Sequence, residues 1–209
     1  MPKTEPFERH TDRYEAWFDA HEDAYQSELA ALRRLLPAPG YGLEIGVGSA
    51  RFAAPLGMEV GLDPAEEMLR HARDRGIDVV RGVAEFLPFA DAAFDTALIV
   101  TTICFVDDIH ETLAEAERIL APDGSLVIGY IDKNSPVGRV YQATKEENPF
   151  YREAEFVSTE QLVDALDAVG FDDFEFVQTI YHPLDEVDGP EPIDAGYGDG
   201  SFVGIKATR

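Results

Sequence analysis

The chain has 209 residues, of which 45% are hydrophobic, so it is long enough for one domain with a large core. Its 41 acidic and 17 basic residues give a net charge of −24, and such a surface repels nucleic acids and anionic membranes. The single cysteine, Cys104, excludes an internal disulfide and a thiolate metal cluster, so we expect no metal site.

The sequence contains neither a pattern typical of a signal peptide nor an apolar run long enough to span a bilayer. We therefore expect a cytoplasmic protein. No internal repeat and no long linker divides the chain, which predicts a single domain over residues 1–209 that is a monomer or a homodimer.

Residues 12–36 place aromatic and leucine side chains at spacings of three and four, which predicts one or two amphipathic helices. Pro37, Pro39 and Gly40 end this region. For Tyr14 and Trp17, contact with a ligand and simple packing on a sheet are equally good interpretations.

Residues 41–63 read as a strand, a glycine-rich turn, a short helix and a second strand. Gly46 and Gly48 permit a tight turn and let a ligand approach the main-chain N–H groups. Asp63 ends the second strand, where a carboxylate accepts hydrogen bonds from a ribose diol. This stretch predicts a cofactor that carries a nucleoside.

A dinucleotide-binding loop would need a third glycine at position 51, which is Arg51. Glu44 precedes the first glycine by two residues and would repel a pyrophosphate. The same carboxylate suits a ligand with an ammonium group, a sulfonium and a ribose.

The segment after Asp63 begins a helix with Pro64 near its first position, so Asp63 has an alternative role as the N-cap of that helix. Met68 lies one turn further on. Its flexible thioether would either cover an adenine or fill space in the core.

Thr96–Val100 is a continuous apolar run, typical of a central parallel strand that is buried on both faces. Thr101 follows at its carboxyl end, where open α/β sheets bind ligands. The segment 132–158 then concentrates aromatic and cationic residues and contains a predicted short helix over 137–147. It is either a substrate-binding cap inserted after the fifth strand or an irregular connector.

The pattern Glu44-x-Gly46-x-Gly48-x-Ala50, the later Asp63, and the segment Gly82 to Phe89 together resemble class I S-adenosylmethionine-dependent methyltransferases of the ubiquinone-biosynthesis-like group. Two positions depart from that pattern. Ala50 replaces the usual third glycine, and Val83 replaces the Asp that commonly meets the adenine amino group.

The resemblance implies an α/β fold, a Rossmann-like doubly wound sheet of about seven strands with helices on both faces. The sheet should be mostly parallel with an antiparallel last strand, and residues 1–40 should form a helical lid. The cofactor would be S-adenosylmethionine, with S-adenosylhomocysteine as product, and the implied cofactor-binding residues are Glu44, Gly46, Gly48, Asp63, Pro64, Met68, Ala84, Glu85, Thr101, Tyr14 and Trp17.

The expected function is direct transfer of the methyl group to a small-molecule acceptor, with neither nucleic acid nor membrane as partner. His21 and Tyr14, on the expected lid, are the candidate catalytic bases. Two alternatives stay open: a nucleotide-dependent oxidoreductase of Rossmann type, and a non-catalytic subunit that binds S-adenosylmethionine and serves a partner.

Overall fold

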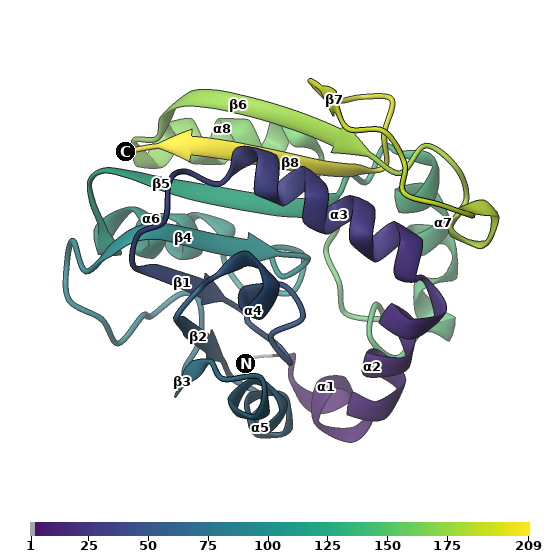
Figure 1. The fold of residues 1–209 in the computed structure, drawn as a ribbon, viewed down its shortest axis with the longest axis horizontal. Coiled ribbons are helices and arrows are strands. Elements are labelled where there is room, and N and C mark those ends of the chain that lie inside the picture. Colours follow the sequence, from purple (N-terminus) through teal and green to yellow (C-terminus); the bar gives the residue numbers. More distant parts are fainter. Residues whose placement is uncertain (1–2) are drawn as a thin grey trace.

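The computed structural model describes residues 3–209, which form one mixed sheet with helices on both faces (Figure 1). The strand order is β3-β2-β1-β4-β5-β8-β6-β7. The strands are β1 (Gly42–Ile45), β2 (Val60–Asp63), β3 (Asp78–Arg81), β4 (Phe94–Val100), β5 (Leu120–Ile131), β6 (Asp172–Thr179), β7 (Asp194–Ala195) and β8 (Phe202–Thr208).

The first five strands pair in parallel, and β8 enters antiparallel between β5 and β6. The expected fold class and the antiparallel last strand are therefore confirmed. The sheet has one strand more than the seven expected. The additional strand is β7, which contains only two residues and pairs with the outer edge of β6. Such a short element has no hydrophobic alternation that a sequence pattern could detect.

The helices are α1 (Glu5–Arg9), α2 (Thr11–Ala20), α3 (Glu22–Leu35), α4 (Ala53–Leu56), α5 (Glu66–Asp74), α6 (Ile109–Ile119), α7 (Pro136–Thr144) and α8 (Thr159–Val169). Two short 3-10 helices, η1 (Lys145–Glu147) and η2 (Leu184–Glu186), complete the set. The expected helix over 137–147 thus corresponds to α7 followed by η1.

Two hydrophobic cores lie on opposite faces of the sheet. α3, α4 and α5 cover one face, and α6 and α8 cover the other (Figure 1). Apolar side chains of these helices form the two cores. β4 runs through the middle and buries residues toward both cores, with Leu98 on one side and Ile99 on the other. This two-sided burial explains its continuous apolar sequence.

Residues 12–36 form two helices, α2 and α3, as the sequence predicted, and a further helix, α1, precedes them. Breaks occur at His10 and His21, whose backbone leaves helical geometry. α1 and α2 lie beyond the carboxyl ends of the parallel strands, whereas α3 packs directly on the sheet (Figure 1). Leu29, Leu32 and Leu35 are at most 2% exposed, so α3 belongs to the core.

The alternative role of Asp63 as a helix cap is wrong. The N-cap residue of α5 is Ala65, and its side chain makes no capping bond. The carboxylate of Glu8 in α1 instead accepts hydrogen bonds of 2.7 and 3.1 Å from the N–H groups of Glu66 and Glu67. α1 therefore satisfies the first turn of α5 from 58 residues away, which no local sequence pattern indicates.

In the part of the chain that the structure describes, no helix is both long and apolar enough to cross a membrane.

Candidate active site

The turn after β1 relies on left-handed backbone geometry. Gly46, Gly48 and Ala50 have φ values of 74°, 51° and 65°. A Cβ at Gly46 would lie 2.2 Å from Cγ2 of Thr102, so only glycine fits there. Ala50 occupies the slot of the missing third glycine and is fully buried, at the cost of a conformation that L-residues disfavour.

The N–H groups of this turn are bound within the protein. Gly46 and Val47 donate to the carbonyl oxygen of Leu62 at 2.7 and 2.9 Å, and Gly48 donates to Oδ2 of Asp63 at 2.9 Å. These N–H groups therefore already have acceptors within the protein, and the expected approach of a ligand to this turn stays a prediction. The two glycines bring the turn close beneath Thr102 and Tyr14.

Asp63 is held by backbone groups on both carboxylate oxygens. Besides the bond from Gly48, Oδ1 accepts a hydrogen bond of 2.8 Å from Ala65. Burial raises the pKa of Asp63 to about 6, although both backbone bonds lower it. Each oxygen retains further lone-pair capacity, so the group is oriented and still able to accept from a ligand.

Glu44 lies beneath the turn and is 1% exposed. Within residues 3–209 its Oε2 has no hydrogen-bond partner. Burial raises the pKa of Glu44 well above its ordinary value, and the charge of Asp63 adds to this shift. An orphaned carboxylate oxygen in the interior is costly unless a ligand satisfies it.

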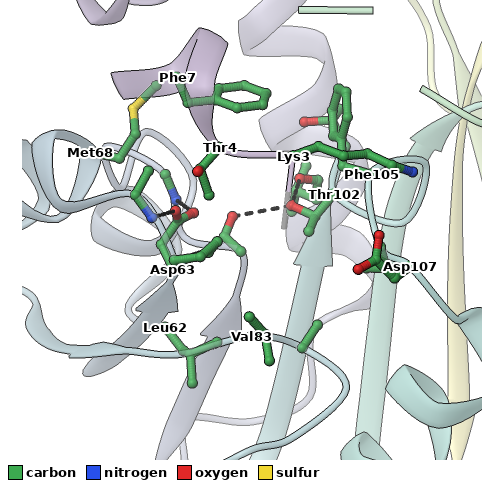
Figure 2. A pocket seen from close by; sticks show the side chains of 18 of the residues that line it. Lys3, Thr4, Phe7, Leu62, Asp63, Met68, Val83, Thr102, Phe105 and Asp107 are labelled. Carbon is green, nitrogen blue, oxygen red and sulfur yellow. Dashed lines mark hydrogen bonds between the residues drawn. The ribbon is translucent and has the colours of Figure 1, made fainter. Parts of the chain in front are cut away.

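A first cavity, with about 800 Å³ of space free of protein atoms, opens over this turn (Figure 2). Its walls combine the carboxyl ends of β1, β2 and β4 with α1 and α2. Nine predicted site residues line it: Tyr14, Gly46, Gly48, Asp63, Pro64, Met68, Ala84, Glu85 and Thr101.

Thr4 and Phe7 also line the cavity and were not predicted. Thr102 and Phe105 line it too, and both belong to the segment that follows β4, where the sequence predicted ligand binding. Phe7 packs edge-on against Phe105 at a centroid distance of 5.2 Å. Its position seven residues before Tyr14 continues the aromatic stripe by two helical turns. That spacing was a usable signal for placing α1 over the cavity.

Glu85 lines the cavity but also has a structural partner. Its Oε1 accepts hydrogen bonds of 2.6 and 3.4 Å from the N–H groups of Asp107 and Asp108. Val83, which replaces the usual Asp, also lines the cavity, and its side chain can offer only an apolar contact. Glu85 therefore ties the segment after β3 to the loop before α6.

A second cavity, of about 1080 Å³ including space open to solvent, adjoins the first. Four residues line both cavities: Phe7, Tyr14, Thr101 and Phe105. Thr101 has φ 49°, a genuine outlier for a β-branched residue, at this junction.

Trp17 and His21 line the second cavity and not the first. Their rings stack at a centroid distance of 4.8 Å, and Nδ1 of His21 lies 3.0 Å from the carbonyl oxygen of Trp17. From the segment 132–158, Tyr141, Phe150 and Tyr151 also reach this wall.

Tyr14 stands over the glycine turn. A Cβ at Gly48 would lie 3.3 Å from its hydroxyl oxygen. Burial raises the pKa of Tyr14 far above its ordinary value, and the charges of Glu44 and Asp63 act in the same direction. The phenol is therefore protonated at neutral pH and able to donate a hydrogen bond.

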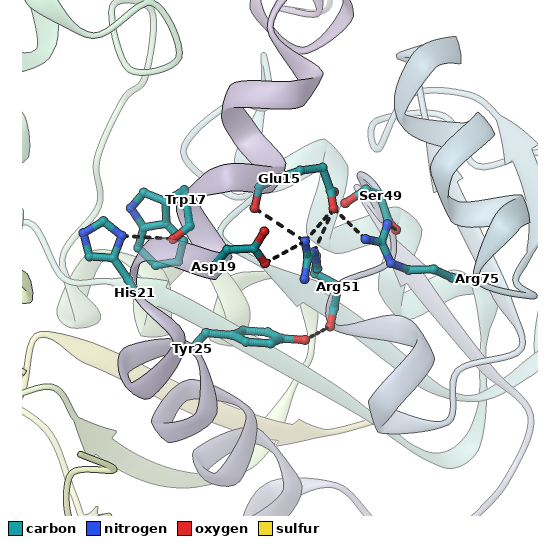
Figure 3. A network of polar contacts seen from close by, with 8 residues as sticks. All are labelled: Glu15, Trp17, Asp19, His21, Tyr25, Ser49, Arg51 and Arg75. Carbon is teal, nitrogen blue, oxygen red and sulfur yellow. Dashed lines mark hydrogen bonds and ion pairs between the residues drawn. The ribbon is translucent and has the colours of Figure 1, made fainter. Parts of the chain in front are cut away.

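A network of charged groups ties α2 to the turn (Figure 3). Oε2 of Glu15 lies 2.7 Å from Nη2 of Arg51 and 2.5 Å from Nη2 of Arg75. Arg75 also donates to the carbonyl oxygen of Ser49 at 2.7 Å. The hydroxyl of Tyr25 donates to the carbonyl oxygen of Arg51. Arg51, which takes the place of a dinucleotide-type glycine, thus anchors α2.

Comparisons with known proteins agree with this geometry. A family model described as a methyltransferase domain matches residues 43–128. A crystal structure from Thermotoga maritima, of a protein named as an S-adenosylmethionine-dependent methyltransferase and possible histamine N-methyltransferase, is 48% identical, covers 99% of both chains and superposes with a TM-score of 0.96. The chain belongs to the S-adenosylmethionine-dependent methyltransferases.

Two further relatives differ in how much of the chain they cover. An uncharacterised protein of Methanocaldococcus jannaschii is 40% identical over 203 residues, covering 97% of this chain and 98% of that protein. A malonyl-[acyl-carrier protein] O-methyltransferase of Methylococcus capsulatus is 33% identical over 112 residues, 48% of this chain and 41% of its own. This methyltransferase uses S-adenosylmethionine as its cofactor, and the oxidoreductase and non-catalytic alternatives are set aside.

Proposed function

We propose that this methyltransferase binds S-adenosylmethionine in the first cavity and methylates a small molecule held in the second. One observation carries the proposal: the two cavities meet at Phe7, Tyr14, Thr101 and Phe105. Two adjoining cavities at the carboxyl edge of a parallel sheet can hold the methyl donor and the methyl acceptor on either side of one junction.

The residues of the first cavity fit the cofactor. Asp63 lines this cavity, and its oriented carboxylate would accept from the ribose diol. Glu44 is not among the lining residues, but it lies beneath the glycine turn, and its orphaned Oε2 would accept from the ammonium group. Pro64 and Met68 offer apolar cover, and the backbone of Ala84 together with Glu85 borders the adenine side.

The cofactor supplies a methyl group already activated on a sulfonium. The protein must mainly orient the acceptor lone pair and exclude water, a contribution of roughly 7–11 kcal/mol in well-oriented reactions. Thr101 and Tyr14 stand at the junction where this alignment is needed. The aromatic side chains around them keep water out.

The two candidate bases differ in their suitability. Tyr14 is a neutral phenol with a raised pKa, so it serves better as a hydrogen-bond donor than as a base. His21 lines the acceptor cavity and is only partly buried, so it is the better candidate for removing a proton. Trp17, stacked on His21, belongs with the acceptor side.

Transfer of a radiolabelled methyl group tests the proposal. Purified protein is incubated with labelled S-adenosylmethionine and either a fractionated metabolite extract or a panel of small acceptors. The panel includes histamine, the substrate in the name of the Thermotoga maritima relative.

We expect label in a small molecule, and much less of it with Asp63→Ala when S-adenosylmethionine is below saturation. Label that appears only in macromolecules, or none in any fraction although the wild type binds S-adenosylmethionine in calorimetry, would reject a small-molecule acceptor.

A further inference from the structure

The second cavity contains one buried carboxylate that the reaction as described leaves without a role. Glu28 lies on α3, is 3% exposed and lines the cavity. Within residues 3–209 its carboxyl group has neither a hydrogen bond nor an ion pair, and burial alone raises its pKa to about 8. A buried, unpaired acid is unfavourable for folding and implies a role that offsets this cost.

The surroundings of Glu28 are aromatic. Nine of the sixteen residues that line the cavity are Phe, Tyr or Trp. Tyr141 and Tyr151 are close enough for their ionisation to respond to Glu28. These two rings stack at a centroid distance of 4.7 Å. Burial raises the pKa of both, so their hydroxyls are uncharged.

The cationic side chain of this cavity does not neutralise Glu28. Arg13 is exposed and lies over the ring of Phe150, 6.0 Å from its centroid. His21 stacks on Trp17. The described wall therefore offers aromatic faces, which attract a cation, and a carboxyl group whose ionised form a bound cation would stabilise.

We propose that the methyl acceptor is a small organic cation, an amine, and that Glu28 binds its cationic nitrogen. This inference rests on the proposed function, which places the acceptor in the second cavity. The net charge of −24 acts in the same direction, because its field attracts small cations toward the protein.

The geometry also separates two parts of the acceptor. Glu28 lines only the second cavity, whereas Thr101 lines both. The atom that receives the methyl group must present a free lone pair at the junction. The cationic nitrogen at Glu28 is therefore an anchor distinct from the reacting atom, and Glu28 acts as a binding and positioning residue.

Trp17 is the only tryptophan of the chain and lines this cavity, so its fluorescence reports binding without turnover. The probes are benzylamine and its neutral isostere benzyl alcohol, each titrated in the absence of S-adenosylmethionine. The variants are Glu28→Gln, Glu28→Asp and Glu22→Gln, the last a control at an exposed position of the same helix.

We expect the wild type and Glu22→Gln to bind benzylamine at least tenfold more tightly than benzyl alcohol, a difference of about 1.4 kcal/mol or more. Glu28→Gln should lose this preference while its affinity for benzyl alcohol stays within about twofold. Glu28→Asp, which retains the charge, should keep part of it. Unchanged calorimetric binding of S-adenosylmethionine confirms that the variants are folded.

Equal affinity of the wild type for both probes, binding of neither probe, or an undiminished amine preference in Glu28→Gln would overturn the inference. Its failure is distinguishable from that of the proposed function. Glu28-dependent amine binding combined with no methyl transfer to any small molecule would support the cation site and reject its assignment to an acceptor.

Discussion

The backbone N–H of Gly48 donates a hydrogen bond of 2.9 Å to Oδ2 of Asp63, which joins two residues of the cofactor site that lie 15 positions apart. The turn after β1 and the tip of β2 are therefore one unit. A change at Asp63 affects both the ligand contact and the shape of the glycine turn.

We predict that Asp63→Ala weakens binding of S-adenosylmethionine by at least about tenfold, because it removes an acceptor for the ribose and releases the N–H of Gly48 into a buried site. Isothermal titration calorimetry measures the change. Asp172→Ala, at an exposed position of β6, is the control and should bind normally. Near-normal affinity in Asp63→Ala would contradict the role of this carboxylate.

Gly46→Ala should destabilise the protein and abolish cofactor binding, because its Cβ would overlap Thr102. Gly57→Ala is a matched control: its φ of 77° is nearly that of Gly46, yet nothing lies within 4 Å of its Cβ. Urea unfolding should show a loss of about 1–2 kcal/mol for Gly57→Ala from backbone strain alone. An equal loss in Gly46→Ala would show that the contact with Thr102 is unimportant.

Glu15→Gln should loosen α2, because the carboxylate that pairs with both Arg51 and Arg75 loses its charge. We expect faster tryptic cleavage at exposed Arg13. Binding of S-adenosylmethionine should weaken by about fivefold or more, because the lost charge-assisted contacts cost about 1–3 kcal/mol. Glu5→Gln disrupts only a fully solvated pair with Arg9, with side chains 69% and 71% exposed, so it should change neither quantity. Identical proteolysis of the two variants would argue against the anchoring role.

The free energy of unfolding should fall as the pH rises from about 4.5 to about 8, because Glu28 has its ordinary pKa of 4.5 when unfolded and one of about 8 when folded. The unfolded chain releases this proton first, so ionisation favours unfolding across that window. Asp63 and Glu44, also with raised values, act in the same direction. The facing phenols of Tyr141 and Tyr151 stay protonated.

Glu28→Gln should therefore be more stable than the wild type at pH 8. The difference should grow by about 1.4 kcal/mol for each pH unit above 4.5 and reach a few kcal/mol. It should match the wild type below pH 4.5, where Glu28 is protonated in both states. Urea unfolding at a series of pH values measures both. A constant difference across the series would show that Glu28 titrates normally.

Local patterns were sufficient for most of the fold. The apolar run of β4 predicted a strand buried on both faces, and the short helix expected over 137–147 is present as α7 followed by η1. The two-residue β7 and the break at His10 were not predicted, because neither has periodicity or cap residues. The N-terminus of α5 was assigned to the wrong acid, since Glu8 reaches it from a helix distant in sequence.

The sequence by itself determined the class of cofactor, because a glycine turn preceded by Glu44 and followed by Asp63 is a local arrangement dictated by backbone sterics and charge. Only the tertiary structure decided what fills the space beside it. Glu28 on α3 and Tyr141 on α7 meet across the second cavity because separate helices pack at the carboxyl edge of the sheet. Glu28 and Tyr141 lie far apart in the sequence, so no local pattern could predict that a buried carboxyl group lies among aromatic rings.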